Sequence, residues 1–179
     1  DQTAALPREI KRIAWWDPAA SEDDKYQEYP ENAPRPVLGS VCHGKGYWVR
    51  IWPEGEVEFK GTAVSDVYVQ PSVSDGWNLI GTGRRTNIGI GSVNLETGAG
   101  TYTLPDAARA GLSHACVWGW DGGQYYLVHP LVPGAETQLK AWEGYWFRSF
   151  VSGSLIVPLT GAMVESAQTT WRSALGEQG

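Results

Sequence analysis

The sequence predicts a mostly β protein made of two related antiparallel β units, in a tandem or fused sandwich with only short helical turns. The first reason is an internal repeat, because related segments predict related units. The second is that 22 Gly and 11 Pro interrupt the 179 residues, which favours short strands and many turns. The third is the abundance of Trp (10) and Tyr (8), whose large rings with polar tips suit half-exposed sheet faces.

The repeat centres on two strand-like segments that begin with Gly-Tyr-Trp. Residues 46–52 read Gly-Tyr-Trp-Val-Arg-Ile-Trp, and residues 144–150 read Gly-Tyr-Trp-Phe-Arg-Ser-Phe. In each copy a glycine follows, at Gly55 and Gly153, and then a second alternation of apolar residues. We therefore expect this strand and the one after it to form the central hairpin of each unit.

The repeat extends upstream to a Trp-Asp pair, which is Trp16-Asp17 in the first copy and Trp120-Asp121 in the second. Each pair follows a predicted strand and precedes a short strand that ends at Pro, a residue that cannot donate to a ladder. Both Asp side chains are expected to cap tight turns, because Asp readily bonds the backbone two residues further on.

These landmarks divide the chain into four parts. Residues 1–62 form an incomplete first β repeat, 63–75 a linking strand, 76–160 a complete second β repeat and 161–179 a C-terminal tail. The tail has apolar residues at near-helical spacing, which suits either a short amphipathic helix or a loose arm.

The first unit is incomplete because it lacks a counterpart of the hairpin predicted to open the second unit at Gly76-Trp77-Asn78. The chain is then either part of a larger protein or has a first unit that strands from elsewhere complete. An incomplete sheet has an unpaired edge, which can pair with another segment or another chain.

Charge and hydropathy exclude several classes of function. The net charge of −6 is spread along the chain, and without a basic stripe we expect no nucleic-acid partner. No apolar run approaches the roughly 18 residues of a transmembrane segment. No signal peptide is visible, although a chain that begins at Asp1 is compatible with a mature product whose leader has been removed.

The two Gly-Tyr-Trp strands carry the candidate ligand-binding face. Because side chains alternate along a strand, each strand has an Arg between two aromatic residues on one face. Stacking of such an Arg on its neighbours contributes about 0.5–2 kcal/mol. We favour a sheet face that neighbouring segments cover, and a platform for stacking sugar rings is the alternative. The two rows are Trp48, Arg50 and Trp52 in the first copy, and Trp146, Arg148 and Phe150 in the second.

No catalytic residues, metal ligands or cofactor-binding motif stand out. His43, His114 and His129 lie far apart and lack the spacing of paired ligands. The acidic segment from Asp17 to Asp24 lacks the spacing of a calcium loop, so we expect a solvated loop. The segment from Gly81 to Arg85 lacks the phosphate-loop pattern, and we expect a loop with two exposed Arg.

The two cysteines, Cys42 and Cys116, are too few for a disulfide scaffold. They occupy different places in the two repeats. A single bridge that joins the units and two buried free thiols are the two alternatives.

A longer series of motifs spans the second unit. It resembles a repeat that is common at the C-terminal ends of bacterial secreted and cell-surface proteins. The resemblance implies a small β-rich module outside the cell, usually appended to something else and without a catalytic role. The sequence departs from the pattern at residues 82–85, where such repeats continue with Asn-Pro. The motifs are G-W-N-L-I-G at 76–81, S-V-N-L at 92–95, T-Y-T-L at 101–104, W-G-W-D-G at 118–122 with Tyr125, Leu139 with W-E-G-Y-W at 142–146, and S-L-I-V-P at 154–158.

We therefore expect a non-catalytic extracellular or cell-surface protein with a structural or interaction role. It would belong to a surface or filamentous assembly and use strand pairing at an open sheet edge. Its partners would be other protein chains, either copies of itself or a larger surface protein, and we expect no cofactor. The alternative is a carbohydrate-binding module of a secreted hydrolase, with glycans as ligands of the aromatic rows.

Overall fold

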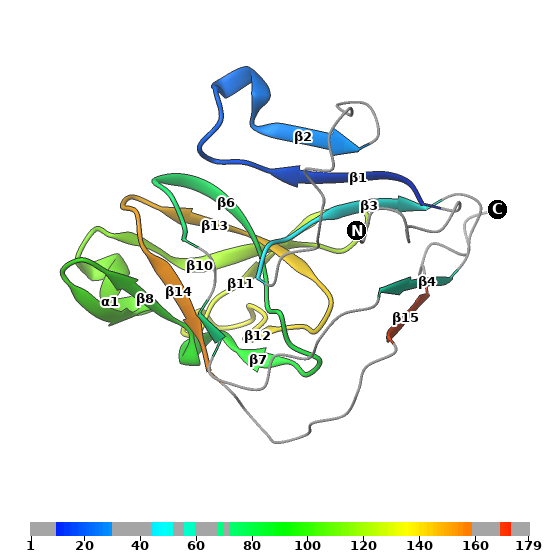
Figure 1. Cartoon of the computed structure of the whole chain (residues 1–179). Coiled ribbons are helices and arrows are strands. Elements are labelled where there is room, and N and C mark those ends of the chain that lie inside the picture. Colours follow the sequence, from blue (N-terminus) through cyan, green and yellow to red (C-terminus); the bar gives the residue numbers. More distant parts are fainter. Residues whose placement is uncertain are drawn as a thin grey trace.

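The computed structural model describes residues 10–29, 44–51, 56–59, 68–69, 72–158 and 169–172 (Figure 1). The fold is mostly β with several antiparallel sheets and few helical residues, as predicted. The first unit has β1 (Ile10–Trp16), a 3₁₀ turn (Glu22–Asp24), β2 (Tyr26–Tyr29), β3 (Trp48–Ile51) and β4 (Glu56–Phe59). The rest has β5 (Tyr68–Val69), β6 (Gly76–Gly81), β7 (Ile88–Gly89), a 3₁₀ turn (Ile90–Ser92), β8 (Asn94–Thr97), β9 (Gly100–Thr103), α1 (Leu104–Arg109), β10 (Ser113–Trp120), β11 (Tyr125–Val128), β12 (Gln138–Leu139), β13 (Gly144–Ser149), β14 (Ser154–Val157) and β15 (Thr169–Arg172).

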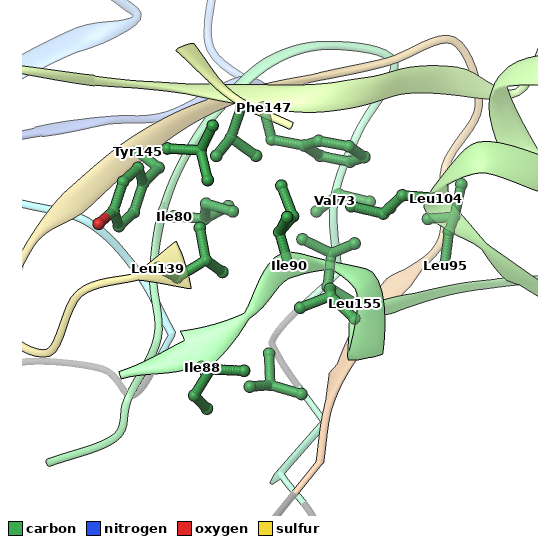
Figure 2. Close-up of a cluster of buried hydrophobic side chains, with 14 of the residues drawn as sticks. Val73, Ile80, Ile88, Ile90, Leu95, Leu104, Leu139, Tyr145, Phe147 and Leu155 are labelled. Atoms are coloured by element: carbon green, nitrogen blue, oxygen red, sulfur yellow. The ribbon is translucent and has the colours of Figure 1, made fainter. Parts of the chain in front are cut away.

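The second unit is a β-sandwich. One sheet has the strand order β11-β10-β13-β6 and the other the order β5-β14-β8-β9. Side chains from both sheets meet in one buried cluster, which contains Tyr145 and Phe147 of β13 together with Leu95 of β8 and Leu155 of β14 (Figure 2). Because side chains alternate along β13, the side chains between these core residues lie on the outer face of the first sheet.

The first unit repeats part of this architecture. Its three-stranded sheet has the order β2-β1-β3, which corresponds to β11-β10-β13. The registers agree as well, because Ile13 pairs with Val49 in the first unit as Val117 pairs with Phe147 in the second. By the same comparison Trp16 corresponds to Trp120, Tyr26 to Tyr125, and Trp48 to Trp146.

The expectation of a central hairpin is wrong in both units. In the first unit β3 pairs with β1, whereas β4 pairs with β15 in a separate sheet. In the second unit strand β13 lies in one sheet and β14 in the other, so the chain turns a corner between them. Gly153 forms this corner, where its N–H and carbonyl both pair with Val73. A Cβ at Gly153 would lie only 2.3 Å from the carbonyl oxygen of Glu96, so the close approach of these backbones requires glycine.

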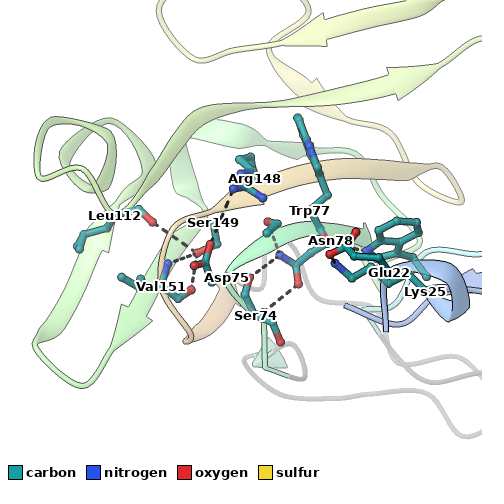
Figure 3. Close-up of polar contacts among 12 residues, drawn as sticks. Glu22, Lys25, Ser74, Asp75, Trp77, Asn78, Leu112, Arg148, Ser149 and Val151 are labelled. Carbon is teal, nitrogen blue, oxygen red and sulfur yellow. Dashed lines mark hydrogen bonds and ion pairs between the residues drawn. The ribbon is translucent and has the colours of Figure 1, made fainter. Parts of the chain in front are cut away.

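The predicted opening hairpin of the second unit is wrong for the same reason. Strand β6 pairs with β13, whereas β8 pairs with β9 and β14 in the other sheet. The bend that leads into β6 is held by buried Asn78, whose side chain accepts from the N–H of Ser74 and donates to the carbonyls of Ser74 and Gly76 (Figure 3). Residues 76–103 are therefore called the opening segment below, because they cross from one sheet to the other.

The segments that follow the two units each pair with the other unit. Strand β5 follows the first unit and pairs with β14 of the second, and β15 follows the second unit and pairs with β4 of the first. The tail is therefore neither a helix nor a loose arm at Thr169–Arg172. Its β-branched and aromatic residues suit a strand, and the edge of β4 supplies the partner.

Two local predictions are confirmed and one is wrong. The side chain of Asp17 accepts from the N–H of Ala19, and that of Asp121 accepts from the N–H groups of Gly123 and Gln124, so both cap turns. Arg84 was expected to be exposed, but only 9% of it is accessible. Its guanidinium donates to the carbonyl of Val157 at 3.1 Å, which satisfies an acceptor at the end of β14.

Candidate functional site

The second aromatic row lies together on the outer face of the sandwich. Trp146 and Arg148 are half-buried on β13, and Phe150 is 41% exposed just after it. The Arg148 guanidinium lies 5.4 Å from the centre of the Phe150 ring and 3.9 Å from the Asp75 carboxylate. The expected stacking of Arg on an aromatic neighbour is thus present in this copy, together with an ion pair to Asp75.

The first row is described only in part. Trp48 is half-buried on β3. The backbone of Arg50 belongs to the same strand, but its side chain and all of Trp52 lie outside the described residues. Whether Arg50 stacks as Arg148 does stays a prediction.

The first tryptophan of each row contacts a tryptophan of the other unit. Trp16 of the first unit packs edge-on against Trp146 at 5.3 Å, and Trp120 of the second unit packs edge-on against Trp48 at 6.5 Å. Trp16 is the counterpart of Trp120, and Trp146 is the counterpart of Trp48. Exchanging the two units therefore turns one of these contacts into the other. This is the relation that a two-fold axis between the units produces.

Residues near such an axis are expected to lie close to their own counterparts, and two pairs agree with this expectation. Gly46 and Gly144 occupy equivalent positions, and a Cβ at Gly144 would lie 3.7 Å from the Cα of Gly46. Tyr125 lies near its counterpart Tyr26, where burial, the Glu28 carboxylate and the Tyr125 phenol raise the pKa of the Tyr26 hydroxyl. The exchange of β5 and β15 between the units obeys the same approximate symmetry.

Strand β6 joins the two units, because it is paired on both edges. On one edge Gly46 donates to the carbonyl of Leu79 at 3.0 Å and Gly81 donates to the carbonyl of Gly44 at 2.8 Å. The peptide groups of residues 79 and 81 therefore face the first unit. Because peptide groups alternate along a strand, Ile80 faces β13, where Tyr145 is its partner.

The same alternation shows which peptide groups of β3 point away from β1, toward the outward edge of its sheet. On β13, Tyr145 and Phe147 face β6, so Trp146 faces β10. Val49 corresponds to Phe147 and thus directs its peptide group away from β1. In the part of the chain that the structure describes, no strand lies along this edge of β3, although the same edge of β13 is covered by β6.

A second difference between the units lies two residues before Gly-Tyr-Trp. Gly44 has a φ of 75° and its counterpart Trp142 a φ of 70°, so the backbone is the same in both units. For a bulky residue this left-handed conformation is strained. The turn around it is held by hydrogen bonds from the Glu143 N–H to the Lys140 carbonyl and from the Lys140 N–H to the Tyr145 hydroxyl. The Trp142 side chain remains 47% exposed.

Tyr145 ties this turn to the core. Its ring is fully buried, and its hydroxyl donates to the Glu143 carboxylate while accepting from Lys140. Tyr126 donates to the same carboxylate. Burial raises the pKa of Tyr145 to about 12, and burial followed by the bond to Glu143 raises that of Tyr126. The group is a structural clamp with all hydroxyls neutral at ordinary pH.

The remaining sequence candidates are dispersed. The Cys116 thiol is free and half-buried, and burial raises its pKa. Cys42 lies outside the described residues, so its state stays a prediction.

His114 packs between Trp77 and Phe150 on the outer face. His129 accepts from the N–H groups of two following residues, and His43 lies outside the described part. Among the described residues, no group of His, Cys, Asp and Glu could hold a metal ion.

Sequence reasoning missed three residues that shape this junction: Trp16, Trp120 and Trp142. Trp16 donates its indole N–H to the carbonyl of Trp77 at 2.7 Å, a contact across 61 positions that no local pattern reveals. Trp142 could have been found by aligning residue 44 with residue 142. A Gly in one copy of a repeat indicates a backbone position that can require a positive φ, and the other copy has a Trp there.

Comparison with protein-family models, with curated protein sequences and with solved structures gave no match. Among the described residues, no helix is both long and apolar enough to span a membrane.

Proposed function

We propose that this chain is a non-catalytic extracellular structural or interaction module that pairs, through its first unit, with other protein chains in a surface or filamentous assembly. The observation that carries the proposal is the edge of β3. Its counterpart on β13 is covered over six register pairs with β6, whereas β3 has β1 as its one strand neighbour among the described residues. Sheet edges of this kind bind strands of partners through main-chain hydrogen bonds.

The extracellular location rests on the motifs of the second unit, which resemble the repeat of bacterial secreted and cell-surface proteins. The packing of Trp48 and Trp146 against the other unit also supports a structural role for both aromatic rows. A row that a neighbouring unit covers contributes to the fold, and its rings are less available to a ligand.

The test measures association and amide exchange together. Native mass spectrometry of the chain at micromolar concentrations, alone and with an added strand peptide of residues 72–103, is expected to show oligomers, either of the chain with itself or of the chain with the peptide, and the outward amide of Val49 should become protected as they form. Val49→Pro removes that donor from an edge where proline is tolerated, and should abolish oligomers; Val49→Ala is the matched control that keeps it. A chain that associates neither with itself nor with the strand peptide, or whose Val49 amide is already protected at high dilution, overturns the proposal.

A second candidate function is glycan binding by the row of Trp146, Arg148 and Phe150. The observation in its favour is that Phe150 and neighbouring Trp77 are both about 40% exposed, so this row is not wholly covered. Glycan-array binding that Trp146→Ala abolishes would support it. Binding of equal strength by the variant would rule out this face.

A further inference from the structure

The two-fold relation between the units says where the missing strand of the first unit would lie. Strand β6 contacts β13 on one edge, residues 44–46 on the other, and Trp16 through the carbonyl of Trp77. Exchanging the units gives the positions that a second such strand would contact. They are the outward edge of β3, residues 142–144 and the indole N–H of Trp120.

We infer that these three elements form one acceptor site for a strand of the β6 type, supplied by a different polypeptide. This rests on the proposed function, and it specifies where the partner strand lies and what its chemistry is. The strand would resemble Gly-Trp-Asn-Leu-Ile-Gly, with small residues at both ends that let the neighbouring backbones approach as closely as Gly46 and Gly144 do.

The side chains at the site agree with this assignment. The Trp16 indole has a hydrogen-bond acceptor on β6. Among the described residues, the Trp120 side chain has ring contacts with Trp48 and Tyr125, and Trp120 is 38% exposed. A strand on the outward edge of β3 would bring its own carbonyl to this indole. No described strand pairs with Trp142 or Glu143, whereas the equivalent Gly44 and Lys45 pair with β6.

The geometry also favours a different polypeptide over a second copy. Each copy has one opening segment, and its β6 is already paired with β13 along all six of its residues and with residues 44–46 on the other edge. A copy that gave up this strand would uncover Tyr145 and Phe147 of its own core. The described residues thus contain two such sites and one such strand, and we assign the second site to a strand of another polypeptide.

The test adds a synthetic peptide of residues 72–103, the opening segment with its preceding bend, to the full chain. One peptide should bind per chain and slow exchange of the Val49 and Ile51 amides. The control peptide carries Ile80→Pro, which removes the donor that would face β3, and should not bind. Trp120→Phe keeps an aromatic ring but removes the N–H, and should weaken binding about fivefold, the effect of one hydrogen bond.

Trp16→Phe is the matched control within the chain. It removes the same N–H from the occupied position, so it should lower the stability of the chain and leave peptide affinity unchanged. Failure of the peptide to bind, or binding without protection of Val49, overturns the inference. So does a dimer of the chain alone that protects Val49 and blocks the peptide, because it would assign the edge to a second copy while the proposed function stands.

Discussion

Tyr145 shows how much one side chain contributes at the scale of the residue. Its ring fills the sandwich core while its hydroxyl holds the turn before β13 through Lys140 and Glu143. A buried hydroxyl with two partners stabilises only while both bonds are made, because a buried polar group without partners costs about 1–3 kcal/mol. In the second unit, the Tyr of the Gly-Tyr-Trp motif therefore anchors the core, whereas its Trp lies on the outer face of the sheet.

The raised pKa of Tyr145 predicts the alkaline behaviour of the chain. The unfolded phenol titrates near 10.0 and the folded one at about 12, so its contribution is complete below pH 10 and is lost as pH rises toward 12. Tyr145→Phe should lower the free energy of unfolding by about 1–2 kcal/mol at pH 7 and reduce this alkaline loss. Urea unfolding between pH 7 and 11 measures both effects. Exposed Tyr125→Phe is the control, and equal loss in the two variants would contradict the prediction.

At the scale of the element, the decisive positions are the corners where the chain changes sheet. Gly153 lies between β13 and β14, with the backbones of Val73 and Glu96 on either side. Before β6, the Asn78 side chain holds the bend through hydrogen bonds to the backbone of Ser74 and Gly76. The corner at Gly153 is thus fixed by distant backbone segments, whereas the bend before β6 is fixed by a local side chain.

Gly153→Ala should therefore be strongly destabilising. The added methyl would lie 2.3 Å from the Glu96 carbonyl oxygen, and backbone must shift to accept it, which costs about 1–3 kcal/mol. Thermal unfolding measures the loss. Gly98→Ala is the control, because a Cβ there meets no atom within 4 Å. A Gly153→Ala chain as stable as the control would show that the corner is more open than the structure has it.

The sequence allowed the repeat, the turn-capping Asp residues and the mostly β class to be predicted, because alternation and turn chemistry are local. The hairpins could not be predicted. Strand β13 and strand β14 have a connection short enough for a hairpin, and only the contacts of Gly153 with Val73 and Glu96 send them to different sheets. The burial of Arg84 was missed because its acceptor, Val157, lies 73 positions away.

The candidate site was predicted only in outline. Trp48 and Trp146 lie on sheet strands, and neighbouring segments were expected to cover the two rows. What contacts these two tryptophans is the other unit, through Trp16 and Trp120. Pairing across a pseudo-symmetric junction depends on how whole units dock, which alternation within a strand does not specify.

At the scale of the whole molecule, the two units are joined by exchanged strands. The partners of β14 are β5 and β8, both earlier in the chain, whereas the partner of β4 is β15 at the far end. Pairing of β4 with β15 brings together residues that are far apart in the sequence, and such pairing forms slowly because the long loop between them must close first. The second unit can therefore form without the tail, but the pairing of the first unit with β15 waits for the rest of the chain.

A chain shortened after Pro158 should separate these contributions. It loses β15, so the amides of residues 56–59 should lose their protection from hydrogen exchange, whereas the main unfolding transition of the sandwich should keep its midpoint. Val69→Pro in the full chain disrupts the equivalent strand β5 and should lower that midpoint instead. A shortened chain whose sandwich unfolds at lower temperature would contradict this division.

The two-fold relation has a consequence for the shape of any assembly. The acceptor site and the strand that it would accept are different surfaces, so the contact is not the self-complementary kind that closes two identical chains into a symmetric pair. The chain offers one acceptor and keeps its own β6 internally paired. Strand addition that uses this acceptor and no strand of the described residues would therefore stop at this chain, which would stand at the end of such an assembly.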